Sequence, residues 1–155
     1  MAQPVLQPPS GRMSHEMKGV WWLLSREDWT VDGHKRIDPV LGADPVGILT
    51  YTATHFAAQF MKRDRNGERN DQQFTAGKNN TGAVNGYDAY FGTYEVNEET
   101  GAVLHTLTGS INPANVGITV SRELRVSGEH LVIQLQTTTH EGESVVRTLT
   151  WKRLN

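Results

Sequence analysis

The chain of 155 residues predicts a single all-β domain, an antiparallel up-and-down barrel of about eight strands. Apolar and polar residues alternate with a period of two in several segments, and glycine-containing turns separate these segments. Most connections are short, so successive strands should pair as antiparallel neighbours, and closing the sheet removes its exposed edges. A β-sandwich is the alternative, because strand periodicity alone does not distinguish the two architectures.

The N-terminal segment precedes the first expected strand. Residues 1–18 contain three prolines and no apolar run of the length that a secretory signal requires. We therefore expect a disordered leader over residues 1–18, with Met13 as an alternative natural start. The barrel domain is then expected over residues 19–155.

The first half of the domain predicts three strands. Residues 19–31 run into the turn Asp32-Gly33, and residues 46–52 and 55–62 form a hairpin around Ala53. The segment 62–88 that follows is polar, rich in glycine and asparagine, and longer than most structureless connections. It is expected either to cover one mouth of the barrel as a lid, with a short helix near residues 75–90, or to be a mobile loop without a role.

Five strands are expected in the second half, over residues 90–97, 102–110, 117–127, 130–138 and 144–154. The clearest signal is the hairpin at the turn Ser127-Gly128, where glycine supplies the positive φ that such a connection needs. The apolar faces of its two strands carry Ile118, Val120, Leu124, Val126, Leu131, Ile133 and Leu135.

Composition excludes several classes of site. The chain holds no cysteine, which removes disulfides and thiolate chemistry and fits a reducing compartment. The net charge is −2 and charges of both signs are interspersed, so the sequence shows no basic patch that would bind nucleic acid or an anionic membrane. No apolar run is long enough to span a membrane. The sequence lacks phosphate-binding glycine loops, a serine-nucleophile elbow and metal-ligand spacings. We expect a cytoplasmic protein that uses no metal or cofactor.

Six short motifs follow one another along the expected barrel: GVWWLLS (19–25), DPVGILTY (44–51), AQFMKRD (58–64), AYFGTYEVN (89–97), PANVG (113–117) and LTWKR (149–153). Together, and in this order over residues 19–154, they resemble the bacterial and fungal lipocalin-like domain family. Gly19-Val20-Trp21 in the first motif is similar to the Gly-x-Trp signature of lipocalins.

The resemblance implies a small up-and-down barrel with a closed base. There Trp21 of the signature motif would pack under an arginine from a late strand, either Arg153 or Arg147. The resemblance also implies one of two functions, since similar barrels include ligand carriers and cofactor-free enzymes such as cyclases and isomerases.

Two polar residues fall on expected inner faces. Arg122 is in phase with Val120, so its guanidinium should point into the barrel, where it needs an internal salt bridge or a ligand carboxylate or enolate. His105 is in phase with Val103 and is a candidate general base or hydrogen-bond donor. A rival inner face of the same strand runs through Leu104.

The predicted site combines aromatic walls with polar groups from several strands. Gln59 is included although its strand has a rival, more apolar face through Phe56 and Phe60. Tyr94 is in phase with Val96 and is a further candidate to move a proton. The predicted ligand-contacting residues are Trp22, Tyr51, Gln59, Tyr90, Tyr94, His105, Ile118, Val120, Arg122, Leu131 and Ile133.

We expect the barrel to bind a small, largely apolar or aromatic molecule, with Arg122 or His105 orienting its polar group. The alternative is a cofactor-free cyclase, isomerase or lyase, in which His105 or Tyr94 moves a proton and Arg122 stabilises developing negative charge. A third alternative is a protein-interaction module whose interior is filled.

Overall fold

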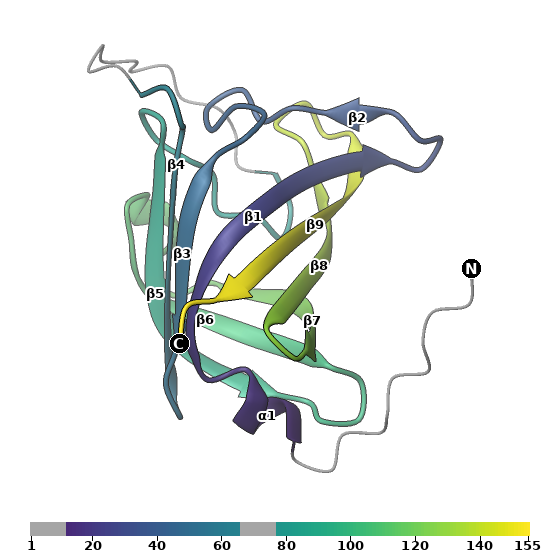
Figure 1. Cartoon of the computed structure of the whole chain (residues 1–155). Helices are drawn as coiled ribbons and strands as arrows, with labels where there is room; N and C mark the ends of the chain where they lie inside the picture. The colour runs from purple at the N-terminus through teal and green to yellow at the C-terminus, as the bar shows by residue number, and fades with distance from the viewer. Residues whose placement is uncertain (1–11, 66–76) are drawn as a thin grey trace.

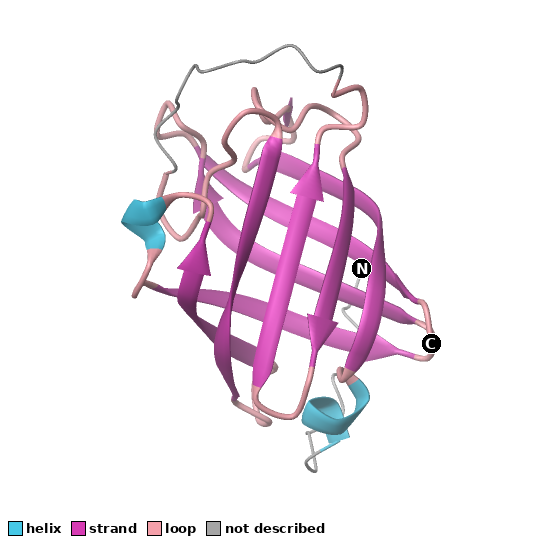
Figure 2. Ribbon diagram, turned by 90° about the vertical axis from the view of Figure 1, so that its left-hand side faces the viewer, coloured by secondary structure: helices cyan, strands magenta, loops and turns pink. Residues whose placement is uncertain are grey.

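The strands of the protein close into one antiparallel barrel (Figures 1 and 2). The computed structural model describes residues 12–65 and 77–155. Each strand pairs with its neighbour in the chain, and β1 pairs with both β3 and β9, which closes the sheet. The predicted eight-stranded all-β barrel is confirmed, with the short β2 added at the edge of β1.

The elements alternate up and down around the barrel. In chain order they are α1 (Arg12–Glu16), β1 (Gly19–Thr30), β2 (Lys35–Arg36), β3 (Val46–Tyr51), β4 (His55–Met61), β5 (Tyr87–Val96), β6 (Ala102–Ser110), η1 (Pro113–Asn115), β7 (Thr119–Ser127), β8 (His130–Thr138) and β9 (Ser144–Arg153). Helix α1 lies at one end of the barrel and β2 at the other, with the longer loops (Figure 1). Among the described residues, no helix is long and apolar enough to cross a membrane.

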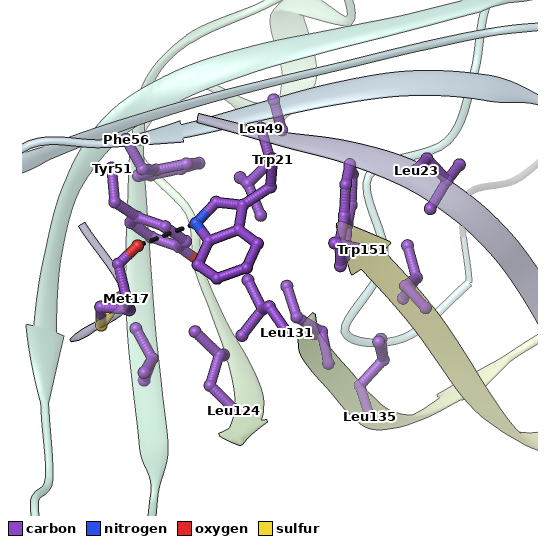
Figure 3. Packing of buried hydrophobic residues seen from close by; sticks show 14 of the residues in the cluster. Met17, Trp21, Leu23, Leu49, Tyr51, Phe56, Leu124, Leu131, Leu135 and Trp151 are labelled. Carbon is purple, nitrogen blue, oxygen red and sulfur yellow. Dashed lines mark hydrogen bonds between the residues drawn. The ribbon is translucent and has the colours of Figure 1, made fainter. Parts of the chain in front are cut away.

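The end of the barrel beside α1 is closed by a packed base. Met17 and Trp21 are fully buried, and the Trp21 indole Nε1 donates a hydrogen bond to the Met17 carbonyl at 2.9 Å (Figure 3). The Arg153 guanidinium lies 4.1 Å from the centre of the Trp21 ring and donates to the Lys18 carbonyl at 2.8 Å. Arg153 is therefore the arginine of the base, and the alternative assignment to Arg147 is wrong.

The expected disordered leader does not extend over residues 12–18. Residues 12–16 form α1, and the Ser14 hydroxyl and amide both donate to the Glu98 carboxylate, at 3.1 and 3.2 Å. Met17 belongs to the apolar core, and the free energy gained by burying its side chain keeps this part of the chain ordered. Residues 1–11 of the predicted leader lie outside the described residues.

A β-bulge in β1 changes which residues face the interior. Leu23 pairs with Trp151, whereas Ser25 pairs with Thr150, so Leu24 is the extra residue. Trp21 and Leu23 face inward before the bulge, and the inward side chains after it are those of Arg26 and Asp28. The bulge thus places two charged groups inside the half of the barrel away from the base.

Part of the predicted segment 62–88 lies across the open end of the barrel. Residues 77–81, called the cover segment below, bond to β7 and β8: the Lys78 amide donates to Thr138 Oγ1 at 2.8 Å, and Asn79 Nδ2 donates to the carbonyls of Gln136 at 3.0 Å and Ser121 at 3.1 Å. The expected helix near residues 75–90 is wrong over its described part, because Asn79 and Asn85 have φ of 56° and 51°, outside the right-handed helical region. Residues 66–76 lie outside the described residues.

Candidate functional site

A cavity of about 40 Å³ lies inside the barrel. One buried water needs about 10–15 Å³ by this kind of measure, so the space holds about three waters or one small group of a ligand. Its apolar walls are Leu41, Leu49, Phe56, Ala58, Phe60, Val120, Ile133, Leu135, Leu149 and Trp151. Its polar walls are Arg26, Tyr51, Asn80, Thr81, Asp88, Tyr90, His105, Arg122 and Arg147.

The cavity wall includes a part of the predicted ligand-contacting set. The predicted residues that line it are Tyr51, Tyr90, His105, Val120, Arg122 and Ile133. The inner face of β6 is the one that carries Val103, His105 and Leu107, while Leu104 is exposed on the outer face. The structure therefore brings His105 and Arg122 to one wall.

Two predicted site residues lie on the outer face of the barrel, and their assignment is corrected. Trp22 is 42% exposed, because Trp21 takes the inner position and adjacent side chains on a strand point to opposite faces. Gln59 is exposed and accepts a hydrogen bond from the Tyr87 hydroxyl, since the inner positions of β4 belong to the rival face through Phe56 and Phe60.

Three further predicted residues face inward without reaching the cavity. Leu131 is fully buried in the base core, and Ile118 packs against that core. Tyr94 lies with its ring centre 5.1 Å from that of Tyr51, and its hydroxyl donates to the Thr52 carbonyl near the closed end. None of the three belongs to the cavity wall as the structure describes it.

Three buried polar atoms lack a hydrogen-bond partner in the described part of the chain, and all three belong to residues of this one cavity. They are Asp88 Oδ1, His105 Nδ1 and Trp151 Nε1. Buried polar groups are nearly always hydrogen-bonded, because an unpaired one loses water without replacement. Their concentration around a single space indicates that this space receives polar atoms from a ligand or from water.

Tyr51 and His105 form a buried pair in the wall. The Tyr51 hydroxyl and His105 Nε2 are 2.6 Å apart. Burial and the neighbouring Arg122 lower the pKa of His105 to about 3, so the imidazole is neutral, and burial raises the pKa of the Tyr51 phenol well above its usual value. In either tautomer Nδ1 has no partner among the described residues, so it is free to pair with a group that enters the cavity, and the low pKa makes the imidazole a weak base.

Three arginines enter the interior, and their partners differ. Arg147 makes two hydrogen bonds to the Asp28 carboxylate, at 2.8 and 3.0 Å, and Arg26 lies 3.3 Å from the Asp38 carboxylate. Arg122 Nη1 instead donates to Ser121 O at 2.8 Å and to Asn79 O and Oδ1 at 3.0 and 3.1 Å.

Arg122 therefore lacks a counter-ion within residues 12–65 and 77–155. Only 7% of the residue is exposed, and its charge is met by neutral oxygens. Burial lowers the pKa of the guanidinium, and a guanidinium nevertheless keeps its proton in proteins. A buried unpaired charge costs several kcal/mol, which an anion in the cavity would offset.

Asp88 is the carboxyl group of the cavity wall that sequence reasoning missed. The Thr81 hydroxyl donates to Asp88 Oδ2 at 2.6 Å, while Oδ1 has no partner in the described chain. Burial raises the pKa of this carboxyl to about 6. The group can therefore accept or release a proton near neutral pH.

The inner positions of Arg26 and Asp28 were not predicted from the sequence either. Arg26 and Asp28 follow the bulge in β1, which the alternation of the sequence does not reveal. Arg147 alternates with Val145, Leu149 and Trp151, so its inward direction was readable from the sequence. No group of three or more histidine, aspartate or glutamate side chains that could hold a metal ion occurs in the described residues.

A family model described as a lipocalin-like domain matches residues 18–154. The match starts one residue before β1 and ends one residue after β9, so it covers the whole barrel. No curated protein matches the chain.

Proposed function

Because the chain belongs to the lipocalin-like domain family, whose closed barrel is suited to holding a ligand, we propose that it binds a small organic acid in its interior. The carboxylate of this ligand takes the place of the Asn79 side chain against Arg122, and this displacement enlarges the cavity of about 40 Å³ so that the apolar or aromatic part can lie against the aromatic walls. The buried Arg122 guanidinium without a carboxylate partner among the described residues is the observation that carries the proposal.

The neighbours of Arg122 suit the same ligand. Tyr51, Tyr90 and Phe56 supply aromatic surface, and His105 supplies an unpaired ring nitrogen. Asn79 of the cover segment gives Arg122 two oxygen acceptors. A carboxylate offers the same acceptors with a full negative charge, so it takes their place with a gain in energy.

The charge of the ligand is tested with benzoate and its neutral isostere benzamide. Calorimetric titration should show benzoate binding about tenfold to a hundredfold more tightly, the range expected for a charge-assisted hydrogen bond. Arg122→Met should abolish this preference. Arg125→Met, on the outer face of the same strand, is the matched control and should keep it. Equal affinities for the two probes in the wild-type protein would contradict the proposal.

A second function, proton transfer on the bound acid, is favoured by Asp88. Its unpaired oxygen and its pKa of about 6 suit a general base near neutral pH, better than His105 with its pKa of about 3. The test is deuterium exchange at C3 of phenylpyruvate in D₂O, followed by NMR. The protein should accelerate the exchange and Asp88→Asn should not; no acceleration by the wild-type protein would remove this candidate.

A further inference from the structure

A second hollow, of about 80 Å³, opens at the end of the barrel away from the base. We call it the rim hollow. Its apolar side is formed by Ile37, which is 58% exposed, together with Pro39, Val40 and Ala83. Only this side is suited to contact the apolar part of a ligand. The side chains of the remaining wall are polar or charged and belong to Asp28, Arg36, Asp38, Asn80, Thr139, His140, Glu141, Glu143 and Arg147.

The rim hollow and the interior cavity share part of their walls. Asn80 and Arg147 line both spaces, and a hydrogen bond of 2.9 Å joins Arg147 Nη1 to Asn80 Oδ1. Leu41 lines the interior cavity while its neighbour Val40 lines the rim hollow. The two spaces therefore lie on opposite sides of one thin partition.

Most of this partition is held firmly. Arg147 is fixed by its two hydrogen bonds to Asp28, and the turn that carries Val40 is fixed by Asp38, whose Oδ1 accepts from the amides of Val40 and Leu41 at 2.8 and 2.9 Å. Asn80 belongs instead to the cover segment, which has no regular secondary structure, and its Oδ1 accepts from Arg147 Nη1 and from the Thr81 amide, both at 2.9 Å. Rotation of this side chain joins the two spaces without moving the Arg147–Asp28 pair or the turn at Asp38, and its cost includes these hydrogen bonds.

We propose that the rim hollow is a second subsite for the same ligand, which passes the partition at Asn80. This inference rests on the proposed function, because Arg122 holds the acid end. Arg147 Nη1 loses its acceptor when Asn80 moves, so an oxygen atom in the middle of the ligand takes that hydrogen bond. The ligand class is an elongated acid with an internal ether, hydroxyl or keto oxygen and an apolar distal group over Ile37.

The test compares benzoate with 4-(benzyloxy)benzoate, which adds an ether oxygen and a second ring. Calorimetry on the full chain should give about tenfold tighter binding of the longer acid, as expected for about 60 Å² of newly buried apolar surface. Ile37→Asp should remove most of this gain and leave the benzoate affinity unchanged. Leu104→Asp, at an exposed apolar side chain on the outer face of β6, is the control and should keep the gain.

The entry of the ligand past Asn80 is tested separately, through the association rate constant. Asn80→Ala should raise the association rate constant of both acids, measured by stopped-flow competition or NMR line shape. A longer acid that binds no tighter than benzoate, or a gain that survives Ile37→Asp, would overturn the second subsite. Unchanged association rates in Asn80→Ala would overturn the passage. Failure of benzoate itself to bind would instead count against the proposed function.

Discussion

At the scale of single residues, the interior holds charges whose pairing decides their effect on stability. Arg147 and Asp28 neutralise each other through two hydrogen bonds. Arg122 is equally buried and is met by neutral oxygens of Asn79 and Ser121. This difference separates an arginine that stabilises the fold from the one that we propose binds the carboxylate of a ligand.

Two substitutions test this difference. Arg147→Met should cost about 3–5 kcal/mol of unfolding free energy, because it leaves the Asp28 carboxylate buried without a partner. Arg122→Met should change the free energy by less than about 1 kcal/mol, or raise it, because no buried anion loses a partner. Urea denaturation monitored by circular dichroism gives both values. A large loss with Arg122→Met would show that Arg122 has a structural role.

Asp88 predicts a pH-dependent stability difference. The folded carboxyl has a pKa of about 6, above its ordinary 3.8, so between these pH values the folded state binds more protons and stability falls as the pH rises. Asp88→Asn removes this loss and should be about 3 kcal/mol more stable than the wild type at pH 7. The difference should vanish at about pH 3, below both pKa values. Urea denaturation at both pH values measures it, and a difference independent of pH would contradict the assignment.

The site residues were only partly predictable from the sequence. Arg122 and Ile133 lie on strands whose alternation is unbroken, so their inward direction follows from period two. For His105 the sequence left a rival inner face through Leu104 open, and only the structure places the imidazole inside. Trp22 was assigned wrongly because only one of two adjacent tryptophans can face inward, and Trp21 is the one that is buried in the base. Asp88 was missed because the sequence analysis placed it in the polar segment 62–88, whereas β5 already starts at Tyr87.

At the scale of elements, bulges determine which side chains reach the interior. In β5 and β6 the pairing shifts between Phe91 and Gly92, opposite Leu107 and Gly109. A β-carbon added to Gly92 would lie 1.8 Å from the Thr106 carbonyl oxygen. The shift therefore needs a glycine at this position for steric reasons.

Gly92→Ala should accordingly destabilise the barrel by about 3 kcal/mol or more, since backbone atoms of β6 must move. Gly128→Ala is the comparison: nothing lies within 4 Å of its added β-carbon, and only its φ of +60° disfavours alanine, at about 1 kcal/mol. Thermal unfolding of the two variants ranks them. Equal losses would mean that the close approach at Gly92 does not limit packing.

At the scale of the whole molecule, the barrel divides into a packed base and a polar upper half. The architecture was predictable, because eight alternating segments with short connections leave few other topologies. The helix α1 at the base was not predictable, because it is only five residues long and follows a proline-rich segment that predicts disorder. The charged upper half was not predictable either, because it depends on the bulge in β1.

Met17→Ala tests the independence of the two halves. Met17 is fully buried in the base and does not line the cavity, so its truncation should cost about 2–5 kcal/mol of unfolding free energy. The affinity for benzoate should be unchanged under conditions where the variant is folded. Denaturation and calorimetric titration on the same sample measure both, and a parallel loss of affinity would show that the base shapes the site.

The most direct test of the central claim is a crystal structure of the protein with 4-bromobenzoate, in which anomalous scattering locates the bromine. The account predicts the bromine among the aromatic walls inside the barrel and the carboxylate within hydrogen-bonding distance of Arg122, with Asn79 displaced. Bromine found only on the outer surface, or a carboxylate inside the barrel but away from Arg122, would contradict it.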